Sequence, residues 1–544
     1  MKIRDIIALG VALLTSSQLM AQGYSIYEDT QMDLLQREMY RVGEKRLHPA
    51  MRSYSLDELN AVFDVDSVLY AGFEKPGKAS NWFRNACRNL LWDDFIQLKG
   101  DDYYVAINPM FDLALGKDGD KKTHLNSRGF YVNGNLGKNF WFYMDLSENQ
   151  MTTTDYETAR YNEYKCKSPV VAGFASSRTG DTDAYDFDFE AATGYIAFRI
   201  GKYLDFQLGK SKNFIGDGYR SLMLSDCAPA YPMFKMNATF GPVKYMFMMS
   251  QYRASKIDDA THNNGVYTKY GFTHYLDVNL GRRVTLGIFE NIMQCSWREG
   301  SGEHRGVDWE YINPFIVLMP GEFDAGSPDK VLVGMNGTLK LAHWFNMYGQ
   351  FVFNEFRISE LTGGKDWWAN KYGFLGGFKS HNLFNVDGWD MQFEVSKVRP
   401  YTYSQYTATS SYTHLGNPLA HPLGANFREV VGIMQYRHKR LYLKGQINIS
   451  KRGEDFDDEI SYGSNPNKPS DNKPGQYGIT MFQGLETDMK YAEGEVAWLI
   501  NPRTRLNFAI TFRYRHKSNE LVDEESKHIN FALRWGIKNW YHDF

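Results

Sequence analysis

Three stretches of this 544-residue chain gather side chains that could recognise a carbohydrate. The first covers residues 126–150, which open with Asn-Ser-Arg-Gly and close with Glu-Asn-Gln. The second covers residues 209–226 and the third residues 394–429, and both are rich in Tyr, Asn, Asp, Arg and Gly. A sugar ring needs a flat aromatic face for its apolar side and planar amide, carboxylate or guanidinium groups for its hydroxyls. The composition of these stretches therefore favours glycan binding.

Twelve residues of the second and third stretches are candidate ligand-binding residues. They are Asn213, Asp217, Tyr219, Arg220, Glu394, Arg399, Tyr401, Tyr403, His414, His421, Asn426 and Glu429. A structural interpretation of the same residues stays open. In that interpretation Gly and Pro fix tight loops packed into the interior of the fold, with Arg399, Glu394 and Glu429 pairing across it.

The sequence contains none of the spacings that mark common catalytic or metal sites. It has no GxSxG, HExxH or Walker A pattern and no strand-GxGxxG-helix unit. His414, His421 and Glu429 share one stretch without the spacing of a metal site, and the acidic run 454–459 lacks the EF-hand pattern. The four cysteines are widely spaced and leave any disulfide pairing open. We therefore predict no catalytic residue, no metal, no cofactor and no enzymatic activity.

The composition argues against three broad classes of protein. Lys and Arg sum to 61 against 64 Asp and Glu, so a nucleic-acid binder held by bulk charge is not expected. No apolar run approaches the roughly 18–20 residues that a membrane-spanning helix requires. Aromatic residues make up 15% of the chain, which argues against disorder.

The N-terminal part of the chain predicts an export signal followed by helices. Lys2 and Arg4 precede the apolar run 6–14, and Ala21 is a small residue suited to cleavage, so residues 1–21 are predicted to be a cleaved signal peptide. Residues 22–99 follow the 3.6-residue period of amphipathic helices.

From about residue 103 the hydrophobic period changes from 3.6 to 2. Leu204, Phe206 and Leu208, for example, alternate with polar residues such as Asp205, which gives each segment one apolar face. Eighteen such segments begin near residues 103, 127, 140, 193, 203, 234, 243, 270, 284, 331, 346, 371, 388, 428, 440, 486, 503 and 528. We assign a further segment near 309–318 to a loop.

The connections between these segments alternate between short and long. Residues 137–139 and 241–242 are short turns, whereas 116–126, 398–427 and 517–527 are among the predicted long loops. An up-and-down membrane barrel sorts its loops in this way, and its sheet must close because lipid offers no partner to a free backbone group. We therefore predict an all-β, transmembrane outer-membrane β-barrel of about 18 antiparallel strands.

The strand count orients the predicted barrel. An even number of strands places both ends of the barrel, covering residues 100–544, on the side of the short turns. That side is the periplasm, so residues 22–99 form a periplasmic helical segment and the long loops are extracellular. Residues 540–544 do not continue the outward face that runs from Ile529 to Ile537. We expect either a bulge there or a tail that hangs below the barrel.

Five strings of residues resemble the capsule-assembly (Wzi-like) outer-membrane protein family, especially its branch that includes the gliding-motility protein RemB. They are 126–129 with 148–150 (NSRG, ENQ), 212–221 (KNFIGDGYRS), 399–403 (RPYTY) and 421–426 (HPLGAN). The resemblance spans roughly residues 100–535. It implies an eighteen-stranded outer-membrane barrel that binds and anchors capsular polysaccharide and is not an enzyme.

The predicted function is therefore a non-enzymatic barrel that holds extracellular polysaccharide at the cell surface. Its partners would be that polysaccharide and outer-membrane lipid, and not nucleic acid. Repeated weak contacts along a polymer give avidity without a deep pocket. Two alternatives stay open: a diffusion channel, and a gliding-motility or secretion accessory that docks surface or periplasmic proteins.

Overall fold

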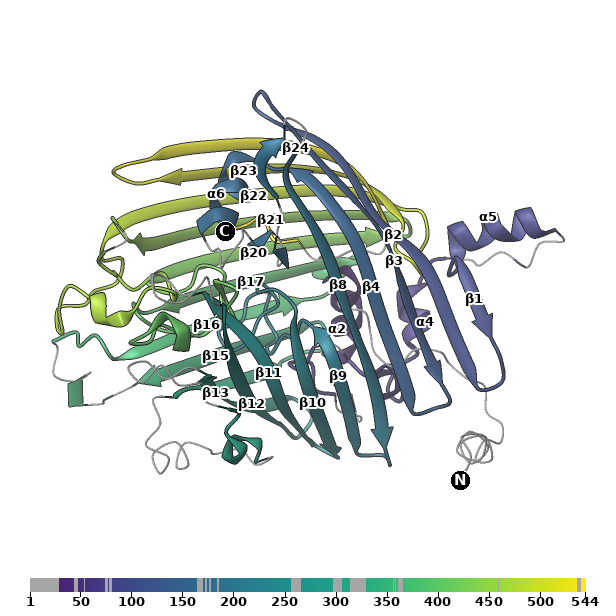
Figure 1. Ribbon diagram of the computed structural model, residues 1–544. Helices are drawn as coiled ribbons and strands as arrows, with labels where there is room; N and C mark the ends of the chain where they lie inside the picture. The colour runs from purple at the N-terminus through teal and green to yellow at the C-terminus, as the bar shows by residue number, and fades with distance from the viewer. Residues whose placement is uncertain are drawn as a thin grey trace.

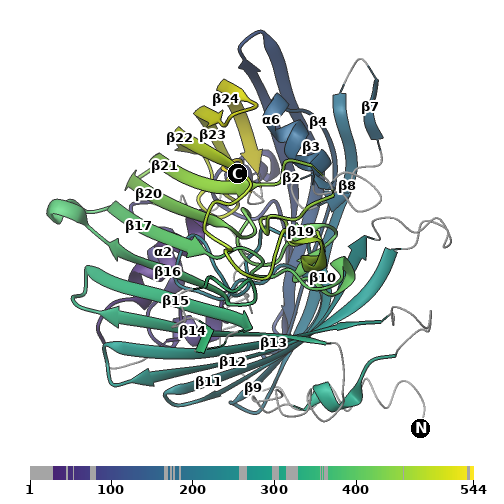
Figure 2. The same cartoon turned by 90° about the vertical axis from the view of Figure 1, so that its left-hand side faces the viewer.

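The chain folds into a closed β-barrel (Figures 1 and 2). The computed structural model describes residues 29–43, 47–52, 54–73, 77, 81–163, 170–171, 174–175, 178–182, 185–255, 266–296, 306–313, 329–355, 357, 359–360, 365–457, 459–535 and 540–544. Eighteen long antiparallel strands of these residues close the wall, because β2 (Tyr103–Asp118) pairs with β24 (Asp523–Trp535). The predicted barrel of about 18 antiparallel strands is confirmed. The predicted signal peptide lies outside the described residues.

The other barrel strands follow one another round the wall in sequence order. They are β3 (Lys121–Leu136), β4 (Phe140–Thr152), β8 (Tyr185–Ile200), β9 (Leu204–Ser211), β10 (Tyr231–Phe240), β11 (Val243–Ser255), β12 (Val266–Leu280), β13 (Val284–Cys295), β14 (Lys330–Lys340), β15 (Phe345–Glu355), β16 (Lys371–Ser380), β17 (Trp389–Val398), β20 (Phe427–His438), β21 (Leu441–Glu454), β22 (Leu485–Leu499) and β23 (Asn507–Ser518). The topology is therefore an up-and-down meander.

Shorter elements occupy the long connections. They are α6 (Asp155–Glu163), β5 (Val170–Val171), β6 (Phe174–Ala175), β7 (Arg178–Thr182), η1 (Trp309–Ile312), η3 (Ala408–Ser410), β18 (Thr413–His414), β19 (Asn417–Pro418) and η4 (Ser470–Asn472). One 3-10 turn, η2 (Leu383–Asn385), lies in a connection at the opposite end, between β16 and β17.

The strands turn apolar side chains outward and polar side chains into the lumen. On β13, Leu286 is 48% exposed and Ile288 is 49% exposed. The carboxylates of Asp145, Asp205 and Asp277 are buried on the inner face of their strands, as their alternation predicts. A bilayer requires this arrangement, because its hydrocarbon takes apolar side chains and leaves no partner for free backbone groups. We call the outward side chains the apolar band.

Two connections that we predict to be long loops are tight turns instead. Residues 119–120 join β2 to β3, and residues 519–522 join β23 to β24. The prediction of long loops at 116–126 and 517–527 is therefore wrong. Backbone pairing continues beyond the apolar alternation, as in the pair Asp118 and Lys121. Hydrogen-bonded hairpins outside the bilayer no longer need an apolar face, so the hydrophobic pattern stops before the strand does. The described part of the segment assigned to a loop near 309–318 contains η1.

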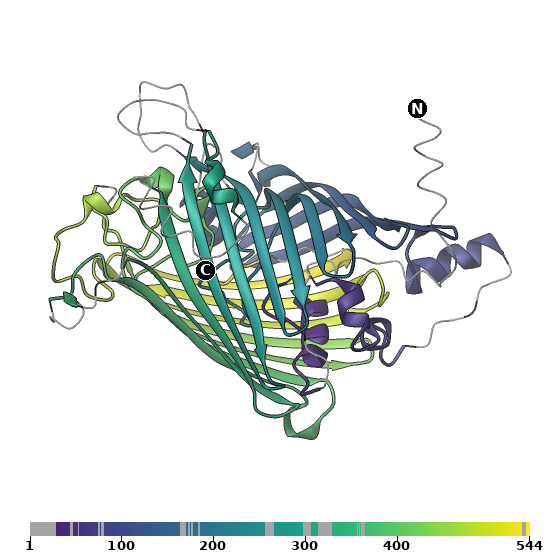
Figure 3. The same cartoon turned by 90° about the horizontal axis from the view of Figure 1, so that it is seen from below.

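Three short helices lie in the barrel mouth on the short-turn side (Figure 3). They are α2 (Asp29–Met39), α3 (Leu56–Asn60) and α4 (Val65–Leu69). Leu35, Leu59 and Val65 pack into one buried apolar cluster. The Arg37 Nη2 atom lies 2.7 Å from Asp390 Oδ2, which ties α2 to β17. No helix among the described residues is long and apolar enough to span a membrane.

The wall has an unusual seam between β2 and β24. Their pairing stops at Phe111 and Trp535, and the strand β1 (Ile96–Lys99) takes over the free edge of β2 from Tyr104 to Ile107. The helix α5 (Trp82–Trp92) precedes β1. Residues 540–544 do not hang below the barrel, so the second of the two alternatives, a hanging tail, is wrong. They lie in the lumen, because buried arginines there hydrogen-bond the backbone oxygens of Asp543 and Phe544.

Candidate functional site

The connection between β9 and β10, residues 212–230, folds into the lumen. Its backbone pairs with itself, where Ile215 N donates to Leu224 O at 2.9 Å, and with the N-terminal segment, where Gly216 N donates to Ala50 O at 2.8 Å. Leu222, Met223 and Leu224 are fully buried in the central apolar cluster. This connection is therefore part of a plug, by which we mean residues 47–52, 212–230, 399–426 and 540–544.

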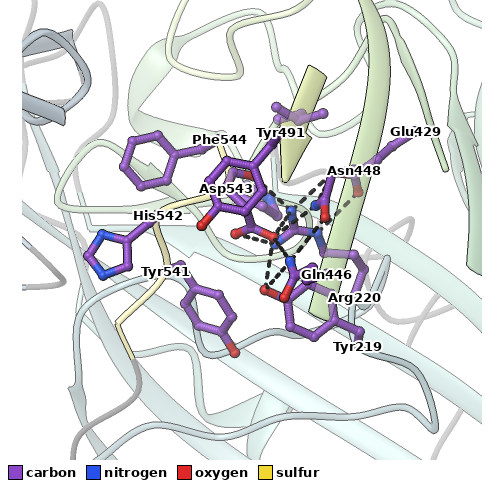
Figure 4. A network of polar contacts seen from close by, with 12 residues as sticks. Tyr219, Arg220, Glu429, Gln446, Asn448, Tyr491, Tyr541, His542, Asp543 and Phe544 are labelled. Atoms are coloured by element: carbon purple, nitrogen blue, oxygen red, sulfur yellow. Dashed lines mark hydrogen bonds and ion pairs between the residues drawn. The ribbon is translucent and has the colours of Figure 1, made fainter. Parts of the chain in front are cut away.

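Arg220 is the centre of a buried polar cluster in this plug (Figure 4). Its Nε and Nη2 atoms donate to the two carboxylate oxygens of Glu429 on β20, at 3.1 and 3.0 Å. Nη2 also donates to Asp543 Oδ2 at 3.0 Å. Burial lowers the pKa of Arg220, but the charges of Asp543 and Glu429 outweigh this effect and hold the pKa well above its ordinary value. The guanidinium is therefore charged, and two carboxylates compensate it.

Amide side chains from the barrel wall complete the cluster. Gln446 Nε2 and Asn448 Nδ2, two inward positions of β21, donate to Asp543 Oδ2 at 2.7 and 2.8 Å. The Tyr219 hydroxyl donates to the same oxygen at 2.8 Å. Buried charges are stable only when their lone pairs and protons are satisfied in this way.

Glu394 on β17 holds the backbone of the plug rather than a side-chain cation. Its two oxygens accept hydrogen bonds from Tyr219 N at 2.9 Å and Arg220 N at 3.0 Å, and the Tyr348 hydroxyl donates at 2.9 Å. A Cβ atom at position 218 would clash with this carboxylate. Glycine at that position therefore lets the loop backbone approach the wall.

His421 joins the plug to the cluster in its neutral form. Its Nδ1 accepts a hydrogen bond from Leu423 N at 3.2 Å, so Nε2 carries the proton and donates to Glu429 Oε2 at 2.8 Å. Burial lowers the pKa of His421 and outweighs the opposing effect of the Glu429 charge. The ring is thus a structural donor.

Asp217 links the plug to the N-terminal helices. The Tyr40 hydroxyl, at the end of α2, donates to Asp217 Oδ1 at 2.5 Å. Asn336 Nδ2 and Thr338 Oγ1 on β14 donate to the other oxygen, each at 2.7 Å. Burial and the Asp217 charge together raise the pKa of Tyr40 well above its ordinary value, so the tyrosine keeps its proton.

The connection 399–426 has an uncommon backbone conformation at three residues, and side-chain hydrogen bonds hold it in place. Tyr401, Tyr403 and Asn426 have φ angles of 64°, 77° and 55°, a region that residues other than glycine seldom adopt. The Tyr401 hydroxyl donates to Ser461 O at 2.6 Å, and the Tyr403 hydroxyl donates to Leu222 O at 2.9 Å. Tertiary hydrogen bonds thus fix a loop that its local preferences would not select.

Three further candidate residues lie outside the Arg220 cluster and contact different parts of the structure. Asn213 accepts a hydrogen bond from Lys235 Nζ at 3.0 Å. His414 is buried and accepts from Arg253 N at 3.0 Å, and burial lowers its pKa to about 3. Arg399 Nη2 donates to Ile479 O at 3.2 Å, so it does not pair with Glu394 or Glu429 as the structural interpretation supposed.

The structure thus brings five of the twelve candidates into one cluster: Tyr219, Arg220, Glu394, His421 and Glu429. The other seven hold separate parts of the plug. Tyr219 is half-buried, and the remaining eleven are buried. Sequence reasoning missed Asp543, Gln446 and Asn448. The alternation of β21 would have placed the last two in the lumen, whereas nothing in the sequence indicated that residues 540–544 turn inward.

Two cavities lined by described residues lie beside the plug. One of about 190 Å³ is lined by charged residues of the wall, such as Lys444, Glu493 and Arg513, and by His542. A second of about 260 Å³ is lined by Tyr156, Arg515 and Phe544 among others. The helix α6 and residues 540–544 contribute to the walls of both, and Glu157 Oε1 on α6 lies 2.5 Å from His542 Nδ1.

The long loops present an exposed group of aromatic side chains that we call the aromatic rim: Trp367, Tyr406 and Tyr477. Tyr406 is 46% exposed and Tyr477 is 51% exposed, while Trp367 is half-buried. A cation lies over each ring: Lys330 over Tyr406 at 5.4 Å, Arg357 over Trp367 at 5.0 Å, and Lys365 over Tyr477 at 5.9 Å. The rim therefore combines flat faces with positive charge.

Backbone pairing holds two segments of the rim together. Gly478 N donates to Lys365 O and Trp368 N donates to Gln476 O, both at 3.0 Å. Arg399 contacts both segments, because it donates to Ile479 O and lies 3.8 Å from the Asp366 carboxylate. The buried Tyr401 packs against Trp368 beneath the rim. Two of the sequence candidates, Arg399 and Tyr401, thus support exposed aromatic side chains that the sequence reasoning did not single out.

The described residues contain no group of three or more His, Cys, Asp or Glu side chains arranged to hold a metal ion. The polar cluster is occupied by its own hydrogen bonds, and Arg220 uses both Nε and Nη2. Its chemistry is therefore structural.

The fold is similar to that of Wzi from Escherichia coli. That protein is described as an outer-membrane protein involved in group 1 capsule assembly and as a carbohydrate-binding β-barrel. The two chains share 13% sequence identity with a TM-score of 0.54, and the match covers 95% of this chain and 100% of that one. The predicted resemblance to the capsule-assembly family is thereby confirmed for the fold alone.

More distant similarity extends to porins. OprD from Pseudomonas aeruginosa has 9% identity and a TM-score of 0.40, over 79% of this chain and 94% of that one. A BenF-like porin from Pseudomonas fluorescens has 8% identity and a TM-score of 0.42, over 79% and 98%. No protein-family model matches the chain, and no curated protein sequence matches it.

Proposed function

We propose that this barrel lies in the outer membrane and anchors extracellular polysaccharide at the cell surface. The observation that carries the proposal is the plug, which is built from the loops, locked to the wall by the Arg220 cluster, and continuous with an exposed aromatic rim. A plugged barrel suits an anchor, because a polymer is then held outside and does not enter the lumen. The carbohydrate binding described for Wzi, a barrel of similar fold, supports the same assignment.

The proposed orientation follows from the loops. The short turns and the helical segment 22–99 face the periplasm, and residues 1–21 are removed as a signal peptide on export. The long loops and the aromatic rim then face the medium. The apolar band between them contacts lipid.

The proposed glycan contacts are the rim side chains. An aromatic face takes the apolar side of a sugar ring, and the Lys330, Arg357 and Lys365 cations beside the rings suit an acidic polysaccharide. The buried candidates, such as Tyr403 and Asn426, act by holding the loops that carry the rim. Each contact is weak, and repetition along a polymer gives the avidity.

The test is binding of the purified, detergent-folded barrel to polysaccharide from its own source cells. We expect saturable binding by the wild type. A Trp367→Ala/Tyr477→Ala variant should bind about tenfold more weakly, since each aromatic contact is worth about 0.5–1.5 kcal/mol. Phe384→Ala is the matched control, because Phe384 is 79% exposed and lies at the short-turn end. Equal binding by wild type and the double variant would refute the rim site.

A diffusion channel is the second candidate function, and the two cavities beside the plug favour it. Eighteen strands are enough to enclose an aqueous passage when nothing fills it. Conductance across planar bilayers separates the two functions. A plugged anchor gives no stable open level, whereas a steady open pore in the wild type would favour transport. If the wild type neither binds polysaccharide nor conducts, a role as an accessory that docks a protein partner is favoured.

A further inference from the structure

The helix α5 has an apolar face that no described part of the protein covers. None of its residues is buried. With about 100° between successive residues, one half of the helix carries Trp82, Phe83, Ala86, Cys87, Leu90 and Leu91. The other half carries Arg84, Asn85, Arg88 and Asn89, together with Trp92, which packs under Arg440 at the end of the helix. Trp82 is 80% exposed and Phe83 is 61% exposed, so the apolar half faces away from the barrel.

The helix is nevertheless capped at its start and attached to the barrel at its end. The Asn81 side chain caps its first turn by accepting from Arg84 N at 2.8 Å. At its other end, Asn501 Nδ2, in the turn between β22 and β23, donates to the backbone oxygens of Asn89 and Leu90 at 3.2 and 3.0 Å. These contacts use the polar edge of α5 and its last turn. The attachment therefore fixes the helix in place and leaves its apolar half uncovered by the described residues.

The attachment places α5 beside the apolar band at the seam. The helix leads through residues 93–95 into β1, and it projects from the side of the barrel at the short-turn end (Figures 1 and 3). Ile96 and Leu98 of β1 pair with Ile107 and Val105 on the outward face of β2, and they are 44% and 51% exposed. The apolar band thus continues across β1 toward α5.

The charge of α5 matches one surface in particular. The helix has no acidic residue, and its charged residues are Arg84, which is exposed, and Arg88, which pairs with Asp93 at 3.2 Å just beyond the helix. An amphipathic helix with cations on its polar face and Trp, Phe and Leu on the other lies in the interface of a membrane that contains anionic lipid. Docking of a protein partner would not explain why the apolar half of α5 continues the lipid-facing wall while its polar half carries cations.

We propose that α5 is an interfacial helix that lies in the inner leaflet of the membrane beside the β1–β2 seam. Its apolar half enters the acyl boundary, and the exposed Arg84 lies at the level of the phosphates. The helix thereby covers the stretch where β24 leaves the wall. The inference rests on the membrane placement proposed above and concerns a lipid contact that polysaccharide anchoring does not require.

Cys87 lies on the apolar half and gives a site for a probe. The test uses the full chain with Cys166, Cys227 and Cys295 replaced by Ser, labelled with bimane at Cys87. The protein is placed in nanodiscs of phosphatidylethanolamine and phosphatidylglycerol. We expect blue-shifted emission that nitroxide-labelled lipid quenches strongly and iodide quenches weakly.

Two matched labels make the result decisive. Asn85→Cys in a Cys87→Ser background has similar exposure on the polar half, and it should be quenched mainly by iodide. Leu286→Cys, on the outward face of β13, reports whether the barrel is in the bilayer at all. If the lipid quenches the label at position 286 but not the label at Cys87, the interfacial helix is refuted while the membrane placement stands. Protection of Cys87 from both quenchers would indicate contact with a second protein copy and would also refute the proposal.

Discussion

At the scale of single residues, the central side chain is Arg220. It is fully buried, and it is the cation that Glu429 and Asp543 share. Removing one member of a buried ion group is costly because the remaining charges lose their compensation. The plug therefore depends on this arginine more than on any exposed ion pair.

Arg220→Ala should lower the free energy of unfolding by about 3–5 kcal/mol, because Glu429 and Asp543 stay buried without a cation. Urea titration of the detergent-folded barrel measures the change. Arg41→Ala, which breaks a surface pair with Glu38, is the control and should have little effect. A triple variant Arg220→Met/Glu429→Gln/Asp543→Asn should lose less stability than Arg220→Ala. An Arg220→Ala barrel as stable as Arg41→Ala would contradict this account of the cluster.

A second residue-scale prediction concerns acid. Burial lowers the pKa of His414 to about 3, whereas an unfolded histidine has a pKa near 6.5. Between these values the unfolded chain binds the proton and the folded chain does not, so stability falls as the pH falls from about 6.5 toward 3. Above pH 6.5 the effect disappears.

His414→Gln should therefore reduce the loss of thermal stability between pH 7 and pH 4.5. The temperature at which the folded gel band converts to the unfolded one measures it. His343→Gln, at an exposed turn position, is the matched control and should keep the full acid dependence. The same acid dependence in all three proteins would show that His414 is not held neutral.

At the scale of elements, the plug is positioned in part by a close approach of its backbone to the wall at Gly218. Gly218→Ala places a methyl group against the Glu394 carboxylate, which accepts the amides of Tyr219 and Arg220. We expect the plug to loosen and to become sensitive to limited proteolysis between residues 212 and 230. Gly376→Ala on β16 meets no atom within 4 Å and should behave as wild type. Equal protease resistance in both variants would contradict the proposed packing.

Elements were predictable wherever the bilayer imposes a pattern. All eighteen strands follow from alternation, because lipid outside and polar lumen inside act on every second residue. The hairpin ends at residues 116–126 and 517–527 lie beyond the apolar alternation, and the prediction failed there. The seam was also not predictable, since the four residues of β1 are too few to show a period.

The candidate site was predictable in composition but not in pairing. Glu394, Glu429 and Arg220 could be singled out, yet the proposed partner of the carboxylates was Arg399. The Arg220 guanidinium pairs with Glu429 instead, and Glu394 accepts the backbone N–H of Arg220. Pairing across a lumen depends on how loops fold back, and residue spacing carries no information about that. Asp543 was missed for the same reason.

At the scale of the whole molecule, a wall of eighteen strands is closed at one end by helices and in its centre by loops. The loops that close it also carry the aromatic rim, so the plug and the rim are one structure. Damage to the plug should therefore weaken glycan binding without any direct contact being lost. An open channel would not couple these properties.

The most direct test measures where the polysaccharide goes in cells. A strain lacking this protein would be complemented with wild type, with Trp367→Ala/Tyr477→Ala, or with the control Phe384→Ala. Cell-associated and released polysaccharide would then be quantified at equal barrel levels. We expect the double variant to release polysaccharide into the medium while the total stays constant, and the control to retain it. Unchanged cell-associated polysaccharide in the strain without the protein would contradict the proposed anchor.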